Sequence, residues 1–298
     1  IDFTDPIDII SHLMIGSEGT LGFISEITYH TVPDPQFHAT SLAFFKDIYT
    51  ACGASNRLSE SSAAAVELMD RQSLRSIETK TGVPENIRSL DGNVAALLVE
   101  AQAASDEELD SQVAAITNIL ESCALVGPAR FTKDKLQSKQ LWNIRKGLFP
   151  SLGIARQNGT TIIIEDVAFP TNVLDSASVD LQHLFRKYGY IDAVLFGHAL
   201  QGNLHFVFCA DFNREEEVHR YEGLLNDVAN VVTAKYDGSL KAEHGTGRNM
   251  APFVEREWGA EAFAIMREIK QIFDPKRLLN PEVILSDNPR IHVSDLKR

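Results

Sequence analysis

Residues 196–206 read FGHALQGNLHF. Apolar residues on both sides of a turn rich in Gly and Asn predict two paired strands, Ala193 to His198 and Leu204 to Ala210, with the turn at 200–203. On one straight strand, residues seven apart would point to opposite faces. A hairpin instead places His198 and His205 on neighbouring strands, where the two imidazoles can face each other as a cross-strand pair. Two facing imidazoles on a rigid hairpin are a natural start for a metal site.

Strand and helix patterns continue on both sides of this hairpin. Further strands are predicted by alternating or continuous apolar runs at Phe23 to Thr31, Ala39 to Phe45, Val94 to Ala101, Thr161 to Ala168 and Leu240 to Glu243. Helices are predicted at Phe45 to Leu58, Ala63 to Glu78, Asp106 to Ser122, Val173 to Tyr188, Asn213 to Tyr236 and Gly259 to Phe273. This order, strand–helix–strand twice over, predicts an α+β fold of antiparallel sheets with helices packed on one face.

A second chemically rich stretch is KAEHGTGR at residues 241–248. The predicted short strand runs into a loop with two glycines and presents a carboxylate and an imidazole side by side. Two His and one Glu would make a three-ligand set with an open position, as a catalytic divalent metal requires. His244 would then be free to move a proton. A histidine near a strand end is more often structural, so spacing alone leaves both interpretations open.

Two more stretches have weaker patterns. The loop GSEGTLG at residues 16–22 has glycines that could let backbone N–H groups approach a phosphate or a flavin ring, but it matches neither a Walker loop nor GxGxxG, and an ordinary tight turn fits it as well. Arg145 follows Trp142 near a predicted helix end. It could clamp a carboxylate in bidentate fashion, or it could be a surface residue.

Composition narrows the class of protein. The 298 residues carry a net charge of −13, which disfavours a nucleic-acid partner. The three cysteines, Cys52, Cys123 and Cys209, are scattered and form no CxxC pair, which argues against a disulfide framework or a cysteine-built cluster in this segment. No apolar run reaches the roughly 18 residues of a transmembrane helix. These features predict a cytoplasmic protein, with peripheral attachment at the inner membrane as the other option.

Taken together, these segments resemble the FAD-linked oxidases of the vanillyl-alcohol-oxidase type, in the branch of D-lactate, glycolate and D-2-hydroxyglutarate dehydrogenases. The motifs of that branch appear in the same order here: GSEGTLG at 16–22, VELMDR at 66–71, GHxGDGNLH with two changes at 197–205, EHG at 243–245, and DPxxxLNPxxxL from Asp274 onward. The changes are Leu200 and Gln201, where the family usually has Gly and Asp. Some relatives carry a Lys near the position of Ile164.

The resemblance implies a role for each matching residue. His198, His205 and Glu243 would hold a divalent metal, zinc or manganese in relatives, and His244 would be the general base. Arg145 and Asn203 would bind the substrate. The flavin edge would be formed by Gly16, Ser17, Gly19, Thr20, Gly22 and Asn280. The implied reaction is FAD-dependent oxidation of a D-2-hydroxy acid, D-lactate first, to the 2-oxo acid, with electrons leaving through a separate carrier.

The resemblance also implies a domain plan. Residues 1–34 would be the C-terminal edge of the FAD-binding domain, 35–284 a ferredoxin-like substrate or cap domain, and 285–298 a linker. The linker resembles the junction to a cysteine-rich iron–sulfur domain in the long, fused members of the family. Most of the FAD site would lie outside this sequence, so we expect the chain not to retain FAD alone. A homodimer is left open.

Two other functions fit the same residues. A metal-dependent hydrolase could use the His/His/Glu set with a water at the open position as nucleophile. A non-catalytic interaction domain could hold the histidines as a structural cluster, and it would bind no stoichiometric divalent ion.

Overall fold

The computed structural model describes residues 3–80, 83–84, 87–90 and 92–297. The chain divides into two compact units. One combines the N-terminal residues up to Val32 with Ser239–Lys297, and the other is Pro33–Gly238. The two units are described separately below.

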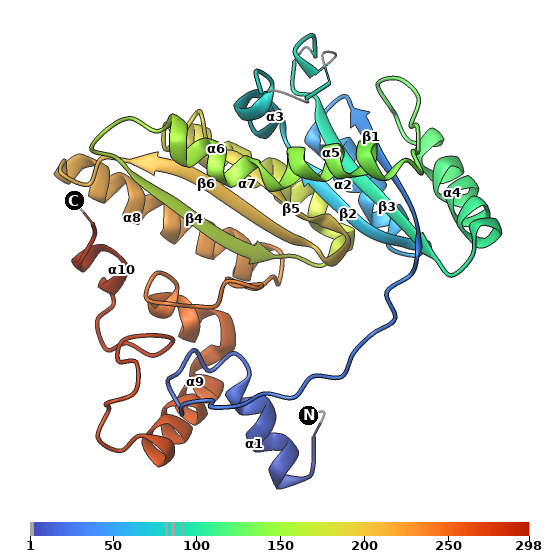
Figure 1. The fold of residues 1–298 in the computed structure, drawn as a ribbon. Coiled ribbons are helices and arrows are strands. Elements are labelled where there is room, and N and C mark those ends of the chain that lie inside the picture. The colour runs from blue at the N-terminus through green and yellow to red at the C-terminus, as the bar shows by residue number, and fades with distance from the viewer. Residues whose placement is uncertain (1–2, 81–82, 85–86, 91, 298) are drawn as a thin grey trace. The chain divides into compact units, whose positions relative to one another are not determined.

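Pro33–Gly238 contains a six-stranded sheet in the order β1-β3-β2-β5-β6-β4, with antiparallel pairing throughout (Figure 1). Its strands are β1 (Phe37–Phe45), β2 (Ala63–Met69), β3 (Ala95–Ala103), β4 (Thr161–Ala168), β5 (Val194–His198) and β6 (Asn203–Ala210). Counted from its outer edge toward the middle of the sheet, each half places its first strand, then its third, then its second: β1-β3-β2 in one half and β4-β6-β5 in the other. The halves join where β2 pairs with β5, so two similar strand sets form one continuous sheet.

Helices cover both faces of this sheet (Figure 1). One layer contains α2 (Ile48–Leu58), α7 (Leu174–Lys187) and α8 (Glu215–Asn230), with α4 (Asp106–Glu121) at the β1 side. On the opposite face lie α5 (Lys135–Lys146) and α6 (Leu148–Ala155), while α3 (Arg71–Ile77) follows β2. The α+β class and the antiparallel sheet are thus confirmed, and the predicted one-sided helical layer is joined by α5 and α6 on the other side.

The apolar core explains why α5 and α6 pack there. Ile144 of α5 and Leu148 at the start of α6 belong to one buried cluster with Met69, Leu98 and Val207 from three strands. Because successive strand residues point to opposite faces, alternate residues of β3 supply this cluster and the core under α2. Burying this many branched side chains from both faces is the main stabilising contribution that such a sheet can gain.

Most predicted elements of this unit are confirmed, but the helix predicted over Ala63 to Glu78 is wrong. The first part of this segment is β2, which is hydrogen-bonded to β3 on one side and β5 on the other, and only Arg71–Ile77 is helical. Asp70 begins that helix by accepting hydrogen bonds from the amide and hydroxyl of Ser73. The predicted helix over Asn213 to Tyr236 is α8 followed by a π-helical segment, Val231–Lys235, and the chain leaves helical geometry before Gly238.

The other unit is built from helices and loops. It contains α1 (Pro6–Met14), whose N-cap Asp5 accepts from the amides of Ile7 and Asp8, α9 (Val254–Phe273) and α10 (Ile291–Ser294). The φ of 79° at Gly259 bends α9 near its start. Neither strand predicted here, Phe23 to Thr31 or Leu240 to Glu243, is formed in the described residues. Phe23 is 90% exposed, and its extended segment has no strand partner among the described residues.

Candidate metal and substrate site

The hairpin that carries His198 and His205 forms as the sequence predicts. β5 and β6 pair, and a short 3-10 turn, Ala199–Gln201, connects them through Gly202 at φ 71°. A Cβ at Gly202 would collide with the carbonyl oxygen of Phe169, and one at Gly197 would collide with the backbone of Asn203. Two glycines are therefore required for this turn to close against its neighbours.

The two imidazoles meet at the turn end of the hairpin. Their ring centroids are 5.3 Å apart and the rings are nearly perpendicular, at 88°. Directly opposite His205 in the register stands Phe196, so the histidines are diagonal neighbours and not the direct cross-strand pair that the sequence suggested. Diagonal neighbours two residues out of register are still within reach of ring-sized side chains. His205 is 3% exposed, which places its ring inside the fold.

A carboxylate that the sequence analysis did not single out connects this hairpin to Arg145. Glu67 on β2 stands opposite His198 in the β2–β5 register, and its Oε1 lies 2.7 Å from Nδ1 of His198. Its second oxygen, Oε2, accepts a hydrogen bond from Nε of Arg145 at 2.9 Å. The Arg145 guanidinium also lies over the ring of Phe196, 4.6 Å from its centroid. His198, a predicted metal ligand, and Arg145, the residue predicted to bind a carboxylate, therefore both contact the buried side chain of Glu67.

Glu67 lies within the VELMDR stretch, and its acidic side chain in an otherwise apolar strand is the signal that could have identified it. A buried carboxylate needs compensating donors, because an unpaired charge in the interior is strongly unfavourable. By holding Nδ1 of His198, Glu67 favours the tautomer that presents Nε2 as the coordinating atom, which is the usual arrangement around a metal-bound histidine.

A second missed carboxylate is Asp166 on β4. It is 2% exposed and stands opposite His205 in the β4–β6 register. A carboxylate oxygen of Asp166 and a ring nitrogen of His205 lie within 4.8 Å of each other, as do ring nitrogens of the two histidines. Strand β4 reads TIIIEDVA, and a buried acid within such a run was again the available signal.

These donors fit a divalent cation. Two imidazoles and a carboxylate are ligand types that zinc and manganese accept. Asn203, at the start of β6, is 6% exposed, and its buried Oδ1 has no hydrogen-bond partner among the described residues. A buried amide oxygen without a partner indicates a group that belongs there, such as an ion, a water or a substrate hydroxyl. Ile164 packs against the apolar cluster containing Ile144.

The remaining predicted ligand and base lie in the other compact unit. Nε2 of His244 is 3.8 Å from Oε1 of its neighbour Glu243, and both side chains are exposed. The loop after them is held by Glu18, whose carboxylate accepts hydrogen bonds from the amides of Thr246 at 2.6 Å and Gly247 at 2.8 Å. This contact joins the EHGTG loop to the GSEGTLG loop, two segments 228 residues apart.

The predicted flavin edge is a closed turn in the same unit. Gly16 and Gly19 have φ of 75° and 72°, and a Cβ at either would meet no other atom within 4 Å. Ser17 and Thr20 are buried, and the Thr20 hydroxyl donates to the carbonyl of Ser17. The glycine side of the loop therefore has room for a flat group, whereas the hydroxyl of Thr20 is used within the turn. The loop fits one wall of a flavin site.

Lys270 and Asp274 tie the DPxxxLNP segment to this loop. Nζ of Lys270 donates to the carbonyls of Thr20 and Leu279 and to Asp274, each at 2.7 Å. Asp274 also accepts from the amides of Leu278 and Leu279. The hydrogen bond from Lys270, aided by these amides, lowers the pKa of Asp274 to about 2. Nearby, Asn280 donates from its side-chain amide to the carbonyl of Glu18, and a Cβ at Gly22 would lie 3.3 Å from the Met14 side chain.

The fold and these motifs define a flavoprotein cap domain, and comparison with protein families agrees. Residues 34–284 match the family described as FAD linked oxidases, C-terminal domain. The match covers most of the chain, and the chain belongs to this family.

Curated relatives are, by name, enzymes of 2-hydroxy acids. The chain is 28% identical to glycolate oxidase subunit GlcD of Bacillus subtilis, over 95% of its own length and 58% of the relative's. It is 25% identical to a D-lactate dehydrogenase of Anaerostipes hadrus, over 91% of its own length and 57% of the relative's. It is 28% identical to the mitochondrial D-2-hydroxyglutarate dehydrogenase of Arabidopsis thaliana, over 93% of its own length and 48% of the relative's. The chain thus spans about half the length of the curated relatives it matches.

Solved structures support the fold alone. An alkyldihydroxyacetonephosphate synthase superposes with a TM-score of 0.56 at 20% identity, covering 91% of this chain and 48% of that one. The 4-ethylphenol oxidase of Gulosibacter chungangensis superposes with a TM-score of 0.57 at 13% identity, covering 86% of this chain and 55% of that one. Within the described part of the chain, no helix combines the length and apolar character needed to cross a membrane.

Proposed function

We propose that this chain is the substrate- and metal-binding part of an FAD-dependent enzyme that oxidises a D-2-hydroxy acid, with D-lactate as the first candidate, to the 2-oxo acid. The observation that carries the proposal is the double contact of Glu67, which holds His198 on one oxygen and Arg145 on the other. A 2-hydroxy acid has a hydroxyl and a carboxylate on neighbouring carbons, and these two residues are suited to those two groups.

The metal ligands in this proposal are the three that the family motifs imply, His198, His205 and Glu243, with zinc or manganese as the ion. A divalent ion held there would lower the pKa of the substrate hydroxyl by Lewis-acid polarisation. Asp166 lies next to His205 and would fix its orientation, as outer-shell carboxylates do for metal-bound histidines. Asn203 would turn its buried amide oxygen to the substrate hydroxyl or to an ordered water.

Arg145 would bind the substrate carboxylate. Its Nε is already committed to Glu67, so the two terminal guanidinium nitrogens are the ones that would face the carboxylate. Stacking on Phe196 restrains the plane of the guanidinium, which limits the entropy lost when substrate binds. The clamp is therefore preorganised by Glu67 and Phe196.

His244 would accept the hydroxyl proton as general base. Its side chain is exposed in the described chain, next to Glu243 and on a loop anchored by Glu18. Anchoring of the loop backbone restricts where the imidazole can lie, which is what proton transfer at hydrogen-bond distance requires. FAD would accept the hydride from C2, and in this proposal the GSEGTLG loop and Asn280 supply one edge of its site while the rest lies outside this sequence. The fused iron–sulfur arrangement is part of the same proposal.

Steady-state oxidation by the complete polypeptide that contains these residues tests the function. D-lactate, L-lactate and D-2-hydroxyglutarate are compared with a dye as electron acceptor, before and after chelation, and against His244→Ala. We expect stereoselective activity that is lost on chelation, restored by zinc or manganese, and reduced in the variant by at least about 100-fold. Lack of activity toward all three acids in an FAD-loaded, metal-loaded enzyme would reject the proposal, and hydrolytic activity without flavin would favour a metal-dependent hydrolase.

A further inference from the structure

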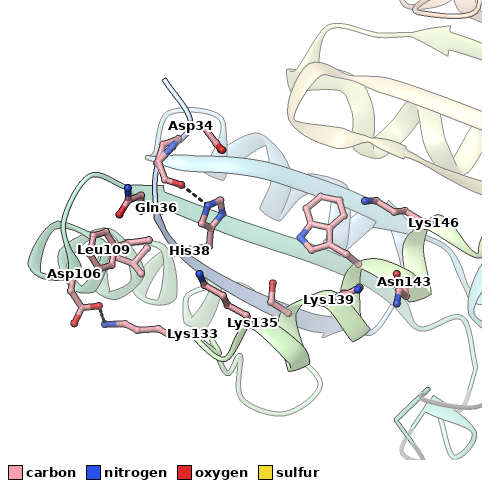
Figure 2. Close-up of a pocket in the computed structure, with 14 residues that line it drawn as sticks. Asp34, Gln36, His38, Asp106, Leu109, Lys133, Lys135, Lys139, Asn143 and Lys146 are labelled. Carbon is pink, nitrogen blue, oxygen red and sulfur yellow. Dashed lines mark hydrogen bonds and ion pairs between the residues drawn. The ribbon is translucent and has the colours of Figure 1, made fainter. Parts of the chain in front are cut away.

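A groove of about 870 Å³ lies on the β1 side of the sheet, between the first residues of β1 and helix α5 (Figure 2). Four lysines line it, Lys133, Lys135, Lys139 and Lys146, together with Trp142 and His38. None of these residues belongs to the candidate metal and substrate site. The volume is within the range of small-molecule sites, roughly 300–1,000 Å³.

The groove is basic in a chain whose net charge is −13. Lys135, Lys139, Trp142 and Lys146 follow one another at intervals of four, three and four residues, which places them along one stripe of α5. The helix has no acidic residue, and the stripe extends for about 16 Å at the usual rise per residue. Positive charge is therefore concentrated along one wall of a hollow.

Two acids, Asp34 and Asp106, also line the groove, and in the described part of the chain only one of its four lysines is paired with an acid. Lys133 pairs with Asp106 at 2.7 Å and Asp110 at 2.6 Å. Lys135, Lys139 and Lys146 form no ion pair within 4 Å with any residue that the structure describes. Lys146 lies over the Trp142 ring instead, 5.8 Å from its centroid.

A buried acid, Glu100, holds Trp142 of the groove in place. Glu100 is 7% exposed and accepts hydrogen bonds from the indole of Trp142, the hydroxyl of Thr40 and the amide of Gln102. The ring of His38 also approaches it, at 3.4 Å. Because its oxygens are shared among these donors, Glu100 fixes the position of Trp142 and does not pair with the lysines.

We propose that this groove binds a small organic phosphate, an anion with two or more phosphate groups and a planar ring. The lysines would contact the phosphates, and Trp142 would pack against the ring. A concave site favours a small ligand over a membrane, which needs cations on an outward-facing surface. The short stripe and the acidic remainder of the chain disfavour nucleic acid.

Tryptophan fluorescence can follow binding directly. The chain has two tryptophans, so Trp258→Phe leaves Trp142 as the only reporter. This variant is titrated with ADP and with inorganic pyrophosphate at low ionic strength, and calorimetry repeats both titrations. We expect saturable binding of both, tighter for ADP because its ring can pack on Trp142. In Lys135→Gln/Lys139→Gln, affinity should fall by about 10- to 100-fold.

The matched control is Lys46→Gln/Lys276→Gln, which removes the same charge at two exposed positions outside the groove. It should bind ADP as the parent does, and circular dichroism should confirm that both double variants are folded. The proposal is overturned if neither ligand binds saturably, or if both double variants lose affinity equally. It is also overturned if vesicles of anionic phospholipid, and not ADP, bind in a manner that depends on Lys135 and Lys139.

Discussion

Arg145 donates a hydrogen bond from Nε to Oε2 of Glu67 at 2.9 Å, across 78 residues of sequence. The other oxygen of the same carboxylate holds Nδ1 of His198. Both Arg145 and Glu67 are largely buried, with side-chain exposures of 12% and 7%. The position of the Arg145 guanidinium and the orientation of the His198 imidazole therefore both depend on Glu67.

Replacing Glu67 with Gln should weaken both functions of this carboxylate. A neutral amide leaves the Arg145 guanidinium without its counter-charge, which should lower the free energy of unfolding by about 2–4 kcal/mol. Zinc affinity should fall by about 10- to 100-fold, because His198 loses its orienting anion. Urea denaturation and calorimetric zinc titration measure the two effects. Glu216→Gln, an exposed partner of Arg214, is the control and should change stability by less than about 0.5 kcal/mol.

Gly245 should be intolerant of a side chain. Its φ is +83°, and a Cβ there would lie 2.8 Å from the carboxylate of Glu18. Gly245→Ala combines backbone strain with a collision in the contact that anchors the loop, and should cost about 1–3 kcal/mol of unfolding free energy. Gly247→Ala provides the comparison, since its φ is +56° but its Cβ would meet only one atom, at 4.0 Å. Equal losses in the two variants would mean that the contact with Glu18 adds nothing.

Asp274 should make stability depend on acid pH. Its folded pKa, about 2, lies below the usual value for an unfolded Asp, near 3.9. The folded state therefore favours the ionised form, and this contribution is fully present above about pH 5 and is lost as the pH falls toward 2. Melting temperatures of the parent and Asp274→Asn should differ most at neutral pH and converge between about pH 5 and pH 2. A constant difference across that range would contradict the assignment.

Cys52 should be unreactive in the folded protein. Burial between helices raises the pKa of its thiol to about 12, so almost no thiolate exists at pH 8. Ellman's reagent should label Cys52 only after urea unfolding, whereas Cys123 and Cys209 are partly exposed. Cys52→Ser should remove one labelled thiol from the unfolded protein and none from the folded one. Labelling of Cys52 under native conditions would show that α2 opens readily.

Local patterns were sufficient to predict the hairpin and most helices of the larger unit. The β5–β6 turn is encoded by adjacent residues, since Gly197 and Gly202 permit contacts that no other residue would allow. The Ala-rich start of β2 has a helical preference, and only pairing with β3 and β5 overrides it. Conversely, Phe23 to Thr31 has the residue pattern of a strand but does not form one, because it has no partner strand among the described residues.

The site was predictable only in part for the same reason. The two histidines were recognisable because one hairpin carries both. Glu67 and Asp166 reach them from β2 and β4, through strand pairings that no local pattern specifies. His198 lies diagonal to His205 because the β5–β6 turn fixes the register of the two strands, with Phe196 opposite His205.

The central claim is that His198 and His205 form a metal centre, and metal stoichiometry tests it most directly. Purified chain is loaded with zinc or manganese, dialysed, and assayed by plasma mass spectrometry alongside His198→Ala/His205→Ala and the surface control His219→Ala. We predict about one ion per chain in the parent and in the control, and none in the double variant, with all three folded. A metal-free parent, or a double variant that retains its ion, would contradict the account.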